Sequence, residues 1–144
     1  EQLQLTSALP LATNKQVKQQ IFDELIGRIA SIQLNFPVAV ETITPEMNSS
    51  LTRLYQYLQQ LEDISQELKV NIGLLILGSS DNTGNKAAND IISLKRANNA
   101  ADMLRKQGLA KDKMFIIGLG QIEIATVSSS ARTVMFNVIH INQL

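Results

Sequence analysis

A nearly unbroken apolar stretch at residues 70–77, VNIGLLIL, constrains the fold more than any other part of the sequence. It is short for a helix and has the usual length of a buried strand, so we predict a strand that is covered on both faces. The stretch runs into a polar turn that begins at Gly78 and contains Asp81 and Gly84. A helical pattern follows over residues 87–107, so this segment is a strand–turn–helix unit.

The rest of the sequence predicts two more helices and three more strands. One helix is expected over 13–30 with Thr13 or Asn14 as its cap, and a second begins at Thr44, where Pro45 takes the first helical position. Alternating apolar residues predict strands near 32–36 and 133–141, and the short apolar run 114–117, closed by GLG, predicts another. The order αβαβαββ favours a mixed sheet with helices packed on one face. The apolar face of the first helix is expected to comprise Val17, Ile21, Leu25, Ile26 and Ile29.

The composition argues against several classes of function. Thirteen basic and thirteen acidic residues balance, so no net positive field attracts nucleic acid or an anionic membrane. The chain has no cysteine, which excludes disulfides, thiolate nucleophiles and cysteine metal sites. His140 is the single histidine, and no acidic residue is placed to orient it as in a hydrolase triad. We therefore expect a binding protein without catalytic residues, metal or cofactor, and not an enzyme.

The turn at 78–84 fits neither a phosphate loop nor a calcium loop, because its spacing is wrong for both. Its charges suggest a different ligand. Backbone N–H groups between a strand and a helix are free to bind, Asp81 offers a carboxylate, and Arg96 offers a guanidinium that can hold a carboxylate. Together these groups suit an amino-acid zwitterion. The simpler interpretation is that Asp81 closes an Asx turn and that Arg96 is solvated or pairs with an acid.

Residues 78–97 also resemble the signature of the OmpA C-terminal-like domain, which is found in Pal- and MotB-type proteins as well. That family's pattern is G-H-T-D-x-x-G, four residues, N, two residues, L-S, two residues, R-A. The segments 32–51, 106–120 and 131–138 resemble other parts of the family. The resemblance covers about 31–141 and implies an α/β fold (an α+β sandwich) of order βαβαββ, with 13–30 as an extra helix and 1–12 as a tail. The signature positions matched in register are Gly78, Asp81, Gly84, Asn89, Ser93, Arg96 and Ala97.

The resemblance implies non-covalent binding of peptidoglycan through the diaminopimelate residue of its stem peptide. By position in the family pattern, Asp81 would bind the ammonium of that residue and Arg96 its carboxylate. Arg132 would assist Arg96. The remaining members of the implied pocket are Ser80, Asn82 and Asn89, the first two mainly through backbone N–H groups.

The sequence departs from the family pattern at the rim of this site. Ser79 and Ser80 stand where the family has His-Thr, and Ala131 and Thr133 replace Asn and a second Arg. Two hypotheses stay open: a periplasmic module that anchors a Gram-negative envelope protein to the cell wall, or an OmpA-like scaffold with a decayed pocket that serves protein contacts or assembly. Because the sequence begins at Glu1, we expect a fragment of an outer- or inner-membrane-attached protein whose anchor lies elsewhere.

Overall fold

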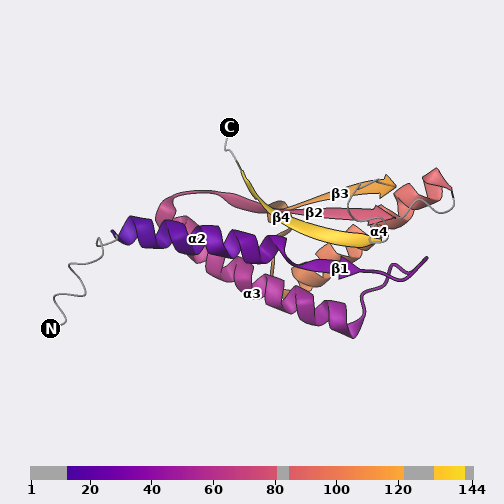
Figure 1. Ribbon diagram of the computed structural model, residues 1–144, viewed down its shortest axis with the longest axis horizontal. Coiled ribbons are helices and arrows are strands. Elements are labelled where there is room, and N and C mark those ends of the chain that lie inside the picture. The colour runs from indigo at the N-terminus through magenta and orange to yellow at the C-terminus, as the bar shows by residue number, and fades with distance from the viewer. Residues whose placement is uncertain (1–12, 81–84, 122–131, 142–144) are drawn as a thin grey trace.

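The computed structural model describes residues 13–80, 85–121 and 132–141, and within them the chain forms three α-helices and four strands (Figure 1). In chain order the elements are α2 (Asn14–Ala30), β1 (Gln33–Asn35), α3 (Pro45–Leu68), β2 (Ile72–Ser80), α4 (Lys86–Gln107), the 3-10 turn η1 (Lys111–Lys113), β3 (Met114–Gln121) and β4 (Thr133–His140). This order confirms the predicted succession of elements.

The strands form one mixed sheet in the order β1-β4-β2-β3 (Figure 1). β2 runs parallel to β3 and antiparallel to β4, and β1 runs antiparallel to β4. The predicted turn at Gly78 is wrong, because β2 continues to Ser80. Gly78 pairs with Val134 on one side and with Gly118 on the other, so neighbouring strands extend β2 beyond its apolar stretch.

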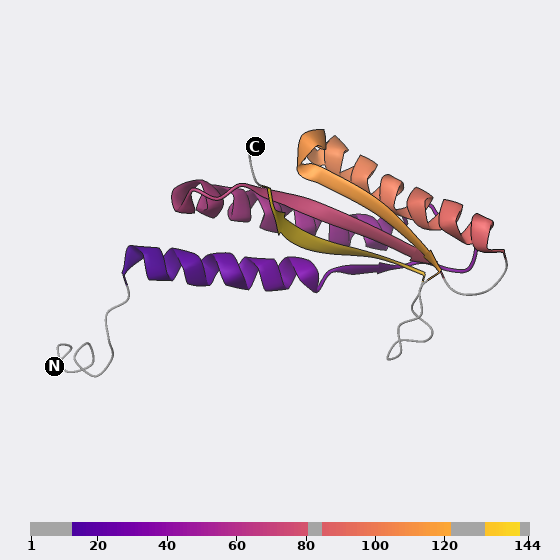
Figure 2. The same ribbon diagram turned by 90° about the horizontal axis from the view of Figure 1, so that it is seen from above.

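All three helices lie on one face of the sheet, as predicted. α4 runs along β2 and β3, while α2 packs beside α3 and reaches β4 (Figure 2). The core between the helices and the sheet includes Leu74, Ile76 and Phe136, each at most 1% exposed. On the opposite face of β2, Leu75 and Leu77 are half-buried. We predicted that both faces of this strand would be covered. Among the described residues, only one face is.

The buried face of α2 differs from the predicted one. Phe22, Leu25 and Ile29 are buried, whereas Val17 and Ile21 are 43% and 41% exposed. The first turns of α2 project beyond the ends of the strands (Figure 2), so side chains there have no sheet to pack against. An ion pair of 2.7 Å between Lys18 and Glu67 ties this part of α2 to α3.

The predicted helix starts are confirmed by their capping hydrogen bonds. The Thr13 hydroxyl accepts from the Gln16 N–H at 3.1 Å, and the Gln16 side chain accepts from the Thr13 N–H at 2.7 Å, which is a capping box. Thr44 caps α3 by accepting from the Met47 N–H at 3.2 Å. Among the helices that the structure describes, none has the length and apolar character needed to cross a membrane.

Candidate functional site

Arg96 is buried at the end of β2 and is held there by backbone carbonyl groups. Its side chain, on the inner face of α4, is only 1% exposed. Nε donates to the Val40 carbonyl at 2.8 Å, Nη2 to the Pro37 carbonyl at 3.1 Å, and Nη1 to the Ser79 carbonyl at 3.3 Å. The guanidinium carbon lies 5.1 Å from the centre of the Phe36 ring, within cation–π distance. Arg96 is therefore not a solvated surface residue.

Two of these carbonyls belong to a tight turn that sequence reasoning missed. The Val40 N–H donates to the Pro37 carbonyl at 3.2 Å and closes the turn. Ala39 has a φ of 60°, a left-handed conformation that residues other than glycine adopt rarely. This backbone shape brings the Pro37 and Val40 carbonyls to Arg96. The sequence held no signal for these contacts, because they use main-chain atoms beside apolar side chains.

Arg96 lines a pocket of about 200 Å³ together with Arg132, Asn89 and Ser80. Nε of Arg132 donates to the Phe36 carbonyl at 3.0 Å, which fixes a second guanidinium at the pocket. The Ser80 hydroxyl oxygen is buried and has no hydrogen-bond partner among the described residues. Buried hydroxyl groups rarely stay unpaired, so a ligand atom is a natural partner. The other lining residues are Val38, Ala39, Ala88 and Ile92.

The described residues that line the pocket favour an anion. Of the described residues that line it, two carry a positive charge and none carries a negative charge. The first turn of α4 also contributes to the lining through Ala88 and Asn89, and a helix N-terminus attracts negative charge. Asn85 caps this helix, because its side-chain oxygen accepts from the Ala87 N–H at 2.7 Å and the Ala88 N–H at 3.3 Å.

The structure brings together four of the six predicted site residues: Ser80, Asn89, Arg96 and Arg132 all line this one pocket. The other two, Asp81 and Asn82, lie outside the described residues, so their contribution stays a prediction.

Two serines near the pocket make hydrogen bonds that join elements of the fold. Ser93 donates to the Asp90 carbonyl at 2.9 Å and accepts from the Gly120 N–H at 2.8 Å, which fastens α4 to β3. The Ser79 hydroxyl lies 2.9 Å from the Thr133 hydroxyl and so links β2 to β4. Thr133 stands at the position where the family has a second arginine, and its hydroxyl makes a structural contact here.

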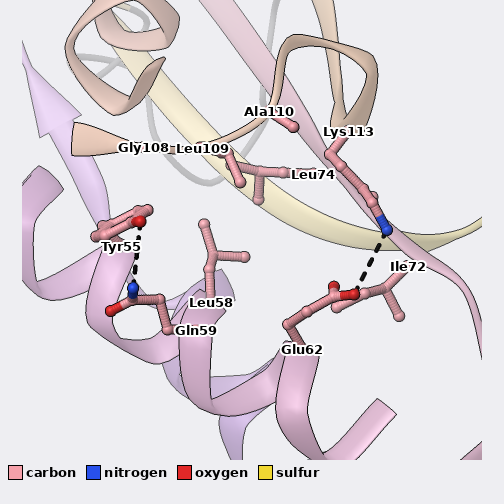
Figure 3. A pocket seen from close by; sticks show the side chains of 11 residues that line it. Tyr55, Leu58, Gln59, Glu62, Ile72, Leu74, Gly108, Leu109, Ala110 and Lys113 are labelled. Carbon is pink, nitrogen blue, oxygen red and sulfur yellow. Dashed lines mark hydrogen bonds and ion pairs between the residues drawn. The ribbon is translucent and has the colours of Figure 1, made fainter. Parts of the chain in front are cut away.

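A second pocket, of about 270 Å³, opens between α3, the start of β2 and the segment after α4 (Figure 3). Its charged lining residues, Glu62 and Lys113, pair with each other at 3.5 Å. Its walls are mainly apolar, so it does not suit a zwitterion, and the Arg96 pocket is the better candidate for a charged ligand. The apolar walls are formed by Leu58, Ile72, Leu74 and Leu109, and Tyr55 and Gln59 hydrogen-bond to each other at 3.2 Å.

The model of the OmpA family matches residues 36–135, a span that includes both pocket arginines. No curated protein sequence matches the chain.

Solved structures with the same fold include the peptidoglycan-associated lipoprotein from Burkholderia pseudomallei, with a TM-score of 0.62 and 18% identity over 76% of this chain and 92% of that one. The OmpA-like domain of FopA1 from Francisella tularensis gives a TM-score of 0.59 and 19% identity over 76% of this chain and 74% of that one. The periplasmic domain of Helicobacter pylori MotB gives 0.60 and 12% identity over 75% of this chain and 74% of that one. At these identities the likeness establishes the fold alone.

Proposed function

Because the chain belongs to the OmpA family, we propose that its Arg96 pocket binds peptidoglycan non-covalently, through the diaminopimelate residue of a stem peptide. One observation carries the proposal. A guanidinium fixed by three backbone carbonyls shares an open pocket with a second arginine and with a buried serine hydroxyl that has no partner among the described residues. This set of donors is complementary to a carboxylate.

The side-chain end of diaminopimelate carries a carboxylate and an ammonium close together. The carboxylate would lie against Arg96 and Arg132, with Ser80 as a further donor. Arg96 is already oriented by its carbonyl partners, so little conformational entropy is lost when the ligand binds. Asp81, the next residue in the sequence after Ser80, is our proposed partner for the ammonium.

In this role the chain is a periplasmic module that tethers a cell-envelope protein to the wall. The alternative is an OmpA-like scaffold that serves protein contacts. This alternative is supported by an exposed apolar strand, because the side chains of Phe115, Ile117 and Leu119 on β3 are exposed to solvent. The two roles can be tested separately because they use different surfaces. Ligand binding at the Arg96 pocket tests the anchoring role.

Titration calorimetry with a diaminopimelate tripeptide tests the proposal. Arg132→Gln and Asp81→Asn should each weaken binding about 10- to 100-fold, since each removes one charge-assisted contact worth about 1.5–3 kcal/mol. The matched control is Arg105→Gln. It makes the same substitution on an exposed arginine of α4 that pairs with Asp102 at 3.2 Å, and its affinity should equal wild type.

A second ligand tests whether Arg132 contacts the carboxylate of diaminopimelate. A tripeptide with lysine in place of diaminopimelate keeps the ammonium and lacks the carboxylate. The wild-type protein should bind it about 10- to 100-fold more weakly, and Arg132→Gln should cause no further loss. Equal binding of both peptides, or an Arg132→Gln variant that behaves like Arg105→Gln, contradicts the proposal.

A further inference from the structure

β3 forms an outer edge of the sheet and exposes apolar side chains along its length. Among the described residues it pairs with β2 alone. Phe115, Ile117 and Leu119 alternate along the strand on the face without helices and are 40%, 43% and 38% exposed. The segment MFIIGLG at 114–120 contains neither a charged residue nor a proline, which are common protections of an edge strand.

The neighbouring helix also exposes apolar side chains. Ile91 and Leu94 of α4 are 57% and 43% exposed. Leu94 lies directly over β3, because a Cβ atom at Gly118 would come within 3.0 Å of its backbone nitrogen and Cα. The strand therefore exposes apolar side chains on one face of the sheet, and the helix that covers β3 exposes them on the other. On its outer side β3 pairs with no other described strand, and an apolar edge of this kind is a template for another strand.

We propose that two copies of this chain pair through β3, antiparallel and edge to edge, with a two-fold axis at Ile117. In an antiparallel pair, residues directly opposite each other point to the same face of the sheet. A pair centred on Ile117 places Ile117 against its own copy and Phe115 against Leu119. All three exposed side chains on one copy then meet an apolar partner on the other, which makes the strand self-complementary.

Neighbouring registers lack this match. Centring the pair on Ile116 places Lys113 opposite Leu119, and centring it on Gly118 places Gln121 opposite Phe115. Register is specified by such cross-strand partners, so the axis at Ile117 is favoured. The result is a continuous sheet with four strands from each copy, and the helix residues Ile91 and Leu94 would add apolar contacts across the axis.

Engineered cysteines provide the test, because the chain contains none of its own. Side chains that meet on a two-fold axis have Cβ atoms about 4.5–5.5 Å apart, close enough for a disulfide after small adjustments. Ile117→Cys should therefore form a covalent dimer in a glutathione buffer. Leu119→Cys alone should not, whereas an equimolar mixture of Phe115→Cys and Leu119→Cys should give the mixed dimer. The matched control is Ile21→Cys, a residue of similar exposure on α2.

Sedimentation equilibrium supplies a readout that needs no oxidation. The wild-type chain should be a dimer at high micromolar concentration, Ile117→Lys should be a monomer, and Ile21→Lys should remain a dimer. Three results would overturn the proposal: a wild-type monomer, cross-linking of Ile117→Cys no faster than of Ile21→Cys, or open-ended aggregates. A wild-type monomer whose β3 amides exchange slowly would show that another part of the chain covers the edge.

Discussion

At the level of single residues, Arg96 belongs to both the fold and the pocket. Its guanidinium satisfies the carbonyls of Pro37, Val40 and Ser79, which join a loop to the end of β2. Removing it would take a charged donor from all three carbonyls, at about 1–3 kcal/mol for each one left buried without a partner. A loss of binding in an Arg96 variant would therefore mix unfolding with lost contact. Arg132 is half-buried, which makes it the cleaner position for a binding test.

Two glycines make a matched pair for a stability prediction. A Cβ atom at Gly78 would overlap the Ser93 carbonyl of α4, whereas one at Gly27 would meet no atom within 4 Å. Gly78→Ala should lower the free energy of unfolding by about 1–3 kcal/mol, because α4 must move away from β2. Gly27→Ala, inside α2, should raise it by about 0.5–1 kcal/mol.

Urea denaturation of both glycine variants measures this difference. The close approach of α4 to β2 at Gly78 also positions Arg96, which follows Ser93 by one helical turn. Equal stability of the two variants would mean that this approach is looser than the structure shows.

At the level of elements, α2 packs as part of the core and not as a loose extension. Ile29 is fully buried, whereas Ile21, two turns earlier on the same helix, is 41% exposed. Ile29→Ala should destabilise the protein by about 2–5 kcal/mol, because it leaves a cavity. Ile21→Ala should change the free energy of unfolding by less than about 0.5 kcal/mol. Thermal or chemical unfolding distinguishes them, and a small effect of Ile29→Ala would show that α2 is dispensable.

Features that depend on short-range interactions could be predicted from the sequence, whereas features that depend on contacts between distant parts of the chain could not. The caps at Thr13 and Thr44 were predictable because each capping bond closes within three residues. The extension of β2 through Gly78 was not, since it depends on pairing with Val134, far along the chain. In the site, motif spacing picked out Arg96. The carbonyls that orient it were not predictable, because main-chain acceptors leave no mark on the side-chain pattern.

At the level of the whole molecule, the proposed dimer and the proposed pocket have a fixed relation. The pocket lies at the carboxyl end of β2, where Ser80 lines it, and β2 is parallel to β3. When two copies of β3 pair antiparallel, the carboxyl ends of the two β2 strands point in opposite directions. The dimer would therefore present its two pockets at opposite ends of one continuous sheet, where each can bind a different stem peptide.

This geometry predicts that dimerisation strengthens attachment to the wall without changing the pocket. A sacculus offers many peptides, so the second pocket binds at a high effective concentration once the first is occupied. Ile117→Lys should leave the affinity for a soluble diaminopimelate tripeptide unchanged and weaken retention on purified sacculi by about 100-fold. Co-sedimentation and calorimetry on the same preparation separate the two effects, with Ile21→Lys as the control that retains both. If Ile117→Lys lowered both affinities equally, the strand edge would act on the pocket itself, and if it lowered neither, the two pockets would not bind the wall together.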